Sequence, residues 1–97
     1  MESVLHRALA AFGAEAQTRM VFEEMAELQK ELCKNARGAD NRLAIAEEIA
    51  DVRIMLDQMC ILHDCESVAK VYRTAKLGRL HDTLKKLKEA QNGQTES

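Results

Sequence analysis

The sequence has no proline and only 4 glycines, so few of its residues break a regular backbone. It also has no tryptophan. Aromatic residues are also scarce, with 2 phenylalanines and 1 tyrosine. Alanine, leucine, glutamate, lysine and methionine are abundant instead, and these residues have the highest helix propensities. The composition therefore predicts an all-α protein.

Features of secreted and membrane proteins are missing as well. No segment approaches the roughly 20 apolar residues that cross a bilayer, and no basic segment precedes an apolar stretch at the N-terminus. The 3 cysteines are an odd number, which does not suit a disulfide framework. A net charge of −2 gives no reason to expect a nucleic acid polymer or a membrane as partner. We therefore expect a cytoplasmic protein.

The apolar periodicity predicts four helices, at residues 2–11, 15–36, 42–63 and 65–89. Gly13 and Gly38 are expected to end the first two helices, whereas Asp40 or Asn41 is expected to cap the third and Asp64 the fourth. The second helix has an apolar stripe that contains Val21, Met25, Leu28 and Leu32. The predicted architecture is an antiparallel helical bundle, with one domain over residues 1–90 and a disordered tail over residues 91–97.

The third predicted helix is apolar on more than one side. Ile45, Ile49 and Leu56 lie in one sector, and Ile54 and Ile61 lie in others. A helix with so little polar surface is buried on several faces, and a chain of 97 residues has few elements of its own to cover them. We therefore expect a homodimer or a homotetramer that forms through the bundle.

Two acidic clusters of the same pattern occupy the middle of the second and third predicted helices. Each is a Glu-Glu pair with another carboxylate three residues after the second Glu, and residues three apart share a helix face. If the two helices pack face to face, four carboxylates converge, and a cation offsets their repulsion. The expected metal ligands are Glu24, Glu27, Glu48 and Asp51.

An oxygen-only donor set favours Mg²⁺, with Mn²⁺ as a substitute, over Zn²⁺. Di-iron bundles need a Glu-x-x-His unit, which neither cluster contains. A zinc site from Cys60, His63 and Cys65 is a separate alternative, but no fourth ligand is close in sequence. The remaining alternative is that the acidic residues form a solvated helix face without a metal.

A metal held by few protein ligands keeps waters and recruits substrate phosphates. Glu23, Glu31 and Glu47 are then available to orient or deprotonate a water, with Glu23 and Glu47 as the candidate catalytic residues. Residues 67–90 carry 7 basic and 2 acidic residues, whereas residues 20–51 carry 4 basic and 8 acidic ones. The candidate phosphate-binding residues are Tyr72, Arg73, Lys76 and Arg79, for which a solvated face or surface salt bridges are the alternative.

The two acidic clusters, with the Arg37-Gly38 turn between them, resemble the Glu-x-x-Glu and Glu-x-x-Asp signature of the MazG-like, all-α nucleoside triphosphate pyrophosphohydrolases. The resemblance covers about residues 20–62, and less specifically the segment 76–80. It implies Mg²⁺-dependent hydrolysis of a nucleoside triphosphate to monophosphate and pyrophosphate, by a dimer or a dimer of dimers. It also implies that Glu24, Glu27, Glu48 and Asp51 hold the metal.

Two other functions fit the same pattern. One is hydrolysis of phosphoribosyl-ATP, which uses similar acidic helices on a nucleotide-like substrate. The other is a non-catalytic helical dimerisation module that has kept the motif. The few aromatic residues reveal no surface on which a base would stack, so the sequence does not indicate the preferred base.

Overall fold

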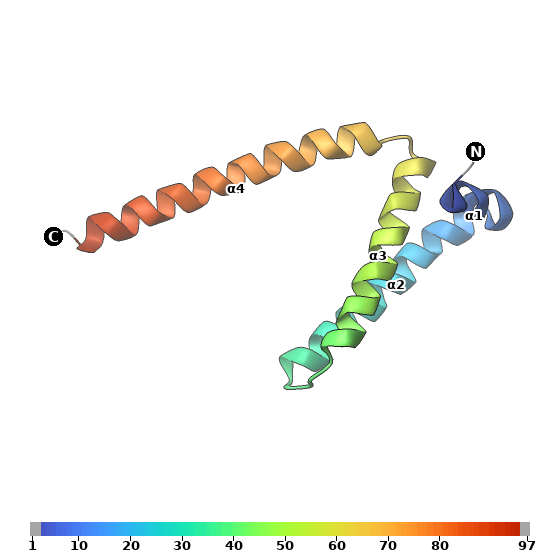
Figure 1. The fold of residues 1–97 in the computed structure, drawn as a ribbon, viewed down its shortest axis with the longest axis horizontal. Coiled ribbons are helices and arrows are strands. Elements are labelled where there is room, and N and C mark those ends of the chain that lie inside the picture. The colour runs from blue at the N-terminus through green and yellow to red at the C-terminus, as the bar shows by residue number, and fades with distance from the viewer. Residues whose placement is uncertain (1–2, 96–97) are drawn as a thin grey trace. The chain divides into compact units, whose positions relative to one another are not determined.

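The structure is a computed structural model that describes residues 3–95, with the side-chain surroundings described up to residue 93. Four helices form in chain order: α1 (Val4–Phe12), α2 (Ala14–Ala36), α3 (Arg42–Leu62) and α4 (Glu66–Thr95) (Figure 1). No strand occurs within residues 3–95. The prediction of an all-α fold is therefore confirmed.

Contacts within the chain divide it into two units, Met1–Asp64 and Cys65–Ser97. The first unit contains α1, α2 and α3, and the second contains α4. The expected single domain over residues 1–90 thus stays a prediction. None of the helices in the described part of the chain is both long and apolar enough to cross a membrane.

Local chemistry explains where the first three helices begin and end. Ser3 caps α1, because its hydroxyl oxygen accepts a hydrogen bond from the backbone N–H of His6 at 3.2 Å. Gly13 separates α1 from α2 with a φ of 88°, a conformation that glycine adopts without a steric penalty. Its N–H donates to the Leu9 carbonyl at 2.9 Å, and its own carbonyl accepts from the N–H of Gln17 at 3.1 Å.

Helices α2 and α3 lie side by side as an antiparallel hairpin (Figure 1). The turn between them contains Gly38 with a φ of 103°. Asn41 lies at the N-cap position of α3, as expected, but its side chain makes no cap hydrogen bond. Its amide instead donates to Glu31 on α2, at 2.9 Å to the backbone carbonyl and at 2.7 Å to Oε2. Asn41 therefore ties α3 to α2 across the turn.

Helix α4 differs from its predicted bounds at both ends. It begins at Glu66, after Asp64 has made the turn with a φ of 49°, so Cys65 and not Asp64 directly precedes the helix. It continues to Thr95, so residues 91–95, expected as part of a disordered tail, are helical. No proline follows Glu89, so nothing forces the helix to end there, although Asn92 and Gly93 have low helix propensity. Residues 96–97 lie outside the described residues.

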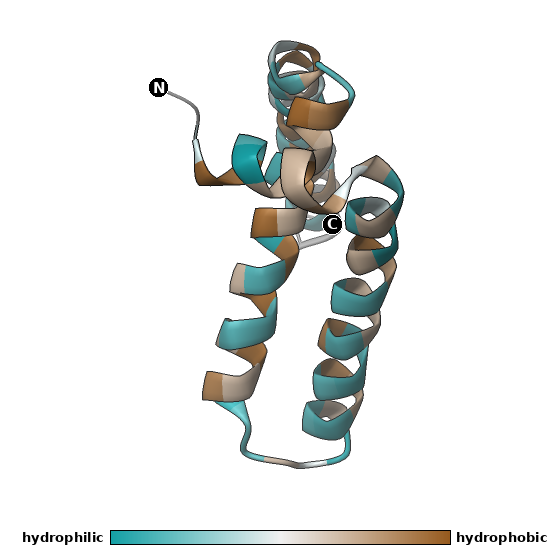
Figure 2. Ribbon diagram, turned by 90° about the vertical axis from the view of Figure 1, so that its right-hand side faces the viewer, coloured by the Kyte–Doolittle hydropathy of each residue, from teal (hydrophilic) through white to brown (hydrophobic). Residues whose placement is uncertain are grey.

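The first unit buries very little apolar surface. Among the described residues, the only buried apolar side chain is Val21, which is 8% exposed. Hydrophobic residues recur along both α2 and α3 (Figure 2), yet many of their large side chains face outward. The predicted apolar stripe of α2 is thus only partly buried, because Met25 and Leu32 are exposed. The outward-facing apolar residues of α2 and α3 include Phe22, Met25, Leu32, Leu43, Ile49, Ile54 and Leu56.

Candidate metal centre

Polar residues recur among apolar ones such as Val21 along the line where α2 and α3 meet, which we call the α2–α3 seam. On α2 the less exposed positions recur every three or four residues, and on α3 a matching set faces them. The seam has a glutamine pair at the end nearest α1, carboxylates in the middle, and the Glu31–Asn41 contact at the turn. Its polar residues are Gln17, Glu24 and Glu31 on α2, and Asn41, Glu48, Asp51 and Gln58 on α3.

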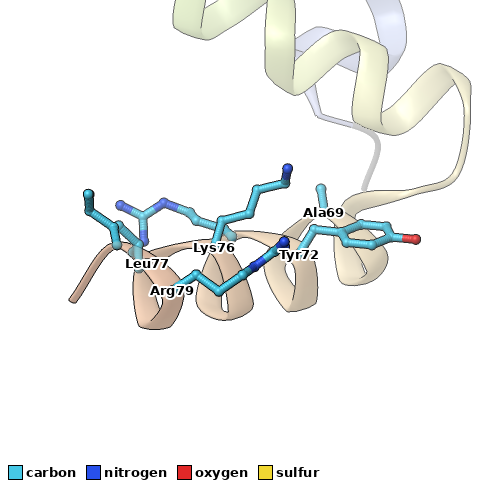
Figure 3. Close-up of a pocket in the computed structure, with 7 residues that line it drawn as sticks. Ala69, Tyr72, Lys76, Leu77 and Arg79 are labelled. Atoms are coloured by element: carbon cyan, nitrogen blue, oxygen red, sulfur yellow. The ribbon is translucent and has the colours of Figure 1, made fainter. Parts of the chain in front are cut away.

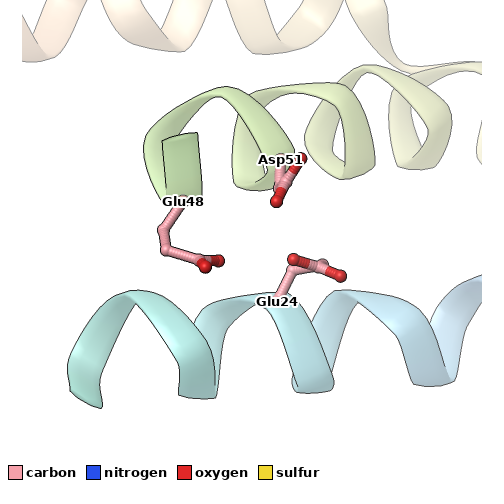
Figure 4. A group of neighbouring side chains, drawn as sticks. All are labelled: Glu24, Glu48 and Asp51. Atoms are coloured by element: carbon pink, nitrogen blue, oxygen red, sulfur yellow. The ribbon is translucent and has the colours of Figure 1, made fainter. Parts of the chain in front are cut away.

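Glu24, Glu48 and Asp51 form the carboxylate cluster in the middle of the seam. Each contributes one carboxylate oxygen, and these oxygens all lie within 4.8 Å of one another. Glu24 projects from α2 toward the two α3 side chains (Figure 4). All three side chains are half-buried, so water does not fully screen their charges. The structure therefore brings together three of the four predicted metal ligands, from two different helices.

The pKa values of two of these carboxyl groups are raised. Burial is the main cause for Glu24, followed by the charges of Asp51 and Glu27, by a hydrogen bond with Asp51 and by the charge of Glu23. Burial also leads for Glu48, with contributions from the charges of Asp51, Glu24, Glu27 and Glu47. Both groups therefore resist ionisation because the negative form is desolvated and repelled.

The Glu48 carboxylate also has an unmatched oxygen. Its Oε2 atom is buried and has no hydrogen-bond partner. A buried acceptor without a partner costs free energy, and a cation that binds it removes that cost. The clustered carboxylates and this orphaned oxygen fit a hard divalent cation such as Mg²⁺ or Mn²⁺, which prefers oxygen ligands.

Glu27 is not a member of the carboxylate cluster and is exposed. It is three residues after Glu24, which turns it about 60° around the helix from the direction of that side chain. Its charge nevertheless raises the pKa of both Glu24 and Glu48, so it lies within electrostatic reach of the cluster. Its role as a fourth ligand stays a prediction.

The two candidate catalytic residues lie beside the cluster. Glu23 and Glu47 are exposed, and each directly precedes a member of the cluster in the sequence. The charge of Glu23 raises the pKa of Glu24, and the charge of Glu47 raises that of Glu48. Glu31, the third residue expected to act on a water, instead accepts hydrogen bonds from Asn41 at 2.7 Å and from Lys34 at 3.2 Å.

The four candidate phosphate-binding residues share one face of α4, which we call the basic face. Tyr72, Arg73, Lys76 and Arg79 line an open pocket there, together with Ala69, Leu77 and Leu80 (Figure 3). Their spacing explains this, because residues three, four and seven apart lie on one side of a helix. The basic face belongs to the second unit of the chain, and the carboxylate cluster belongs to the first.

Two buried glutamines and a small pocket in the first unit were not predicted from the sequence. Gln17 and Gln58 are 7% and 1% exposed, although glutamine is seldom buried. A pocket of about 190 Å³, which we call the methionine pocket, is lined by Met20, Glu24, Asp51, Ile54 and Met55. The spacing in the sequence could have predicted the buried glutamines. Gln17 is seven residues before Glu24 and Gln58 is seven residues after Asp51, so they lie on the same helix faces as the carboxylates.

The zinc alternative gains no support from the described residues. Within residues 3–95, the grouping with ligand atoms close enough for a metal is the carboxylate cluster, and Cys60, His63 and Cys65 do not form another. Comparisons with protein-family models, with curated proteins and with solved structures each find no match.

Proposed function

We propose that this protein hydrolyses a nucleoside or deoxynucleoside triphosphate to the monophosphate and pyrophosphate, with Mg²⁺ as cofactor. The observation that carries the proposal is the convergence of Glu24, Glu48 and Asp51, from two helices, within 4.8 Å. The raised pKa values of Glu24 and Glu48 support it, because perturbed pKa values cluster at functional sites. The resemblance to the MazG-like signature gives the reaction class.

Each group has a defined task in the proposed reaction. Glu24, Glu48 and Asp51 hold the metal, with Glu27 beside them as the expected fourth ligand. When bound, Mg²⁺ neutralises phosphate charge and acidifies a water molecule. The water oxygen attacks phosphorus, the phosphoanhydride bond between the α and β phosphates breaks, and pyrophosphate leaves with the bonding electron pair. Glu23 or Glu47 orients the water and accepts its proton.

The basic face supplies the groups for the polyphosphate. Arg73, Lys76 and Arg79 offer cationic donors, and Tyr72 offers a hydroxyl. Positive side chains stabilise charge that accumulates on phosphate oxygens as the anhydride bond breaks. In this proposal the basic face is the phosphate-binding surface of the second unit.

The proposal includes a homodimer, or a homotetramer made of two dimers. Phe22 is 67% exposed and Leu43 is 77% exposed in the single chain, along with Ile49 and Leu56. Apolar surface of this extent is uncommon on a monomer and is typical of an interface. In this proposal a second copy covers the apolar sides of α2 and α3. The odd cysteine count supports a reducing, cytoplasmic setting for the assembly.

Turnover of a substrate panel tests the function. Purified protein with Mg²⁺ is incubated with ribo- and deoxyribonucleoside triphosphates and with phosphoribosyl-ATP, and the products are identified. Monophosphate plus pyrophosphate from a triphosphate, abolished by Glu48→Gln, supports the proposal. Turnover of phosphoribosyl-ATP alone assigns the related reaction of that substrate. If no compound is hydrolysed and Mn²⁺ does not bind, the helical dimerisation module is the correct reading.

A further inference from the structure

The methionine pocket directly adjoins the carboxylate cluster. Glu24 and Asp51 belong to both, and Met20, Ile54 and Met55 supply the apolar part of the wall. At about 190 Å³ it is smaller than the roughly 300–1,000 Å³ typical of pockets that enclose a whole ligand. It therefore suits one part of a ligand whose remainder lies over the carboxylates.

Two buried glutamines lie one helical turn from residues that line this pocket. Gln58 is one turn beyond Ile54 and Met55 on α3, and Gln17 is one turn before Met20 on α2. Because α2 and α3 are antiparallel, both glutamines lie on the side of the pocket away from the turn at Gly38. Seven residues of helix separate Gln58 from Asp51, a rise of about 10 Å, which is comparable to the length of a mononucleotide.

The Gln58 side chain is incompletely satisfied. Gln58 is 1% exposed, and its Oε1 atom is buried without a hydrogen-bond partner. Buried polar atoms in native proteins are nearly always paired, and an unpaired carbonyl costs free energy. A donor from outside the chain, such as an N–H group of a ligand, removes that cost.

Glu31, at the turn end of the seam, already has hydrogen-bond partners for its side chain. Glu31 receives the Asn41 amide at 2.7 Å and the Lys34 ammonium at 3.2 Å, so both of its carboxylate oxygens have partners. Its backbone carbonyl also accepts from Asn41, at 2.9 Å. For a ligand anchored at the carboxylate cluster, the unmatched Oε1 atom of Gln58 therefore offers a hydrogen-bond acceptor on the side of the methionine pocket.

We infer that the methionine pocket receives the nucleoside part of the substrate, and that the Gln58 amide is a specificity-determining group that accepts a hydrogen bond from the base. This inference rests on the proposed function for the position of the phosphates. The two methionines are flexible and unbranched, so they can move aside as the base enters and let it reach Gln58. An amide carries both an acceptor and donors, so it can read the edge of a base without aromatic stacking.

Base preference in a matched pair of variants tests the inference. Gln58→Met keeps the length of the side chain and removes its hydrogen bonds, whereas Gln29→Met makes the same change at an exposed position of α2. We measure the binding of each nucleoside monophosphate with Mg²⁺ by calorimetry, and kcat/KM for each triphosphate. Gln58→Met should reduce the ratio between the best and the worst base by about tenfold, the effect of one hydrogen bond. Gln29→Met should leave that ratio unchanged, and both variants should bind Mn²⁺ like the wild type.

A second variant addresses the pocket without touching Gln58. Met55→Phe fills the apolar space, so it should weaken monophosphate binding about tenfold or more while Mn²⁺ binding is retained. The inference is overturned if the wild type shows no base preference, if Gln58→Met keeps the wild-type ratio, or if Met55→Phe binds monophosphates normally. If no triphosphate is turned over, the proposed function fails, and monophosphate binding alone then decides whether the pocket binds a nucleoside.

Discussion

Asn41 joins the two helices that carry the carboxylates, because its side-chain amide donates to both the backbone carbonyl and the carboxylate of Glu31. The two distances are 2.9 and 2.7 Å, and the residues lie ten positions apart in the sequence. The contact fixes how α2 is aligned against α3. Since Glu24 is on one helix and Glu48 and Asp51 are on the other, this alignment also determines whether their oxygens converge.

Removing this contact should loosen both the hairpin and the metal site. Asn41→Ala deletes both hydrogen bonds to Glu31 and the one that Asn41 Oδ1 accepts from the Asn35 amide at 3.3 Å, and the bond to the backbone carbonyl alone is worth about 1 kcal/mol. For a domain of this size that corresponds to a fall in Tm of about 4–8 °C. We also expect Mn²⁺ affinity to fall by about 10-fold, as for residues that orient metal ligands. Thermal melts and Mn²⁺ titrations measure both effects, and Gln29→Ala on exposed α2 surface is the control. Unchanged Mn²⁺ affinity would show that the contact does not align the site.

A Mn²⁺ titration should distinguish the metal ligands from the neighbouring acidic residues by the loss of Mn²⁺ affinity when each is replaced. Glu48→Gln removes a member of the carboxylate cluster, so Mn²⁺ affinity should fall by more than the about 10–100-fold typical of supporting residues. Glu47→Gln removes the same charge one position away, at an exposed side chain, and should keep most of the affinity while turnover falls. Electron paramagnetic resonance of free Mn²⁺ gives both affinities. Equal losses in the two variants would mean that net charge, and not the cluster, attracts the metal.

Stability should depend on pH in opposite ways with and without Mg²⁺. The pKa values of Glu24 and Glu48 are raised in the folded protein, so the folded state binds protons more tightly than the unfolded state. The two carboxyl groups therefore add to the free energy of unfolding at a pH below their ordinary pKa of 4.5. This contribution is lost as the pH rises through their raised pKa values. Bound Mg²⁺ replaces the protons, and at 100 times its Kd it stabilises the protein by about 2.7 kcal/mol.

The difference between melting curves in Mg²⁺ and in chelator isolates the stabilisation that comes from Mg²⁺ bound at the carboxylate cluster. The pKa of Glu31 is lowered, mainly by its hydrogen bond with Asn41, so Glu31 contributes with the opposite sign, but equally in both conditions. We expect Mg²⁺ to raise Tm at pH 7 and to have little effect near pH 4.5. In chelator at pH 7, Glu24→Gln should raise Tm, because it removes repulsion. Identical curves in Mg²⁺ and chelator at pH 7 would argue against a preformed site.

Charge on the basic face should matter for substrate affinity. Lys76→Ala and Arg79→Ala each remove a cation proposed to bind phosphate, and should lower kcat/KM for the triphosphate by about 10-fold or more. Lys85→Ala removes a charge of the same sign elsewhere on α4 and should have little effect. Steady-state kinetics at two salt concentrations provides the comparison. If the three variants behave alike, the helix attracts the substrate only through its overall charge.

Association should depend on the outward apolar residues of α2 and α3. Leu56→Lys places a charge on a side chain that is exposed in the single chain, and we expect it to shift the protein from dimer to monomer. Glu66→Lys, on a polar and exposed part of α4, is the control. Analytical ultracentrifugation at micromolar concentration measures the mass. A wild-type protein that is wholly monomeric at that concentration would rule out the proposed assembly.

Helix positions could be predicted from the sequence because they depend on local signals. The starts and ends of α1, α2 and α3 fall within about two residues of expectation, since Gly13, Gly38 and the absence of proline act through the nearby backbone. The placement of Glu48 and Asp51 on one face of α3 was also predictable, because residues three apart share a helix face. The same spacing put Glu27 beside Glu24, yet Glu27 lies outside the cluster.

Two other features depend on which helix faces meet, and the periodicity of the apolar residues does not reveal which faces those are. Met25 and Leu32 belong to the predicted apolar stripe, yet Gln17 and Glu24 lie on the seam in their place. An apolar stripe shows that a face is covered, but not whether its own chain or another copy covers it. The Asn41 contact was missed because an asparagine before a helix predicts a cap, and only the folded hairpin shows the Glu31 carboxylate within reach.

The small core also determines how the chain folds. With Val21 as the only buried apolar side chain among the described residues, a single chain has little hydrophobic free energy to offset its loss of conformational entropy. If the outward apolar residues are buried only on association, folding and assembly become one bimolecular step. The midpoint of unfolding then rises with protein concentration, and dilution alone is enough to unfold the chain.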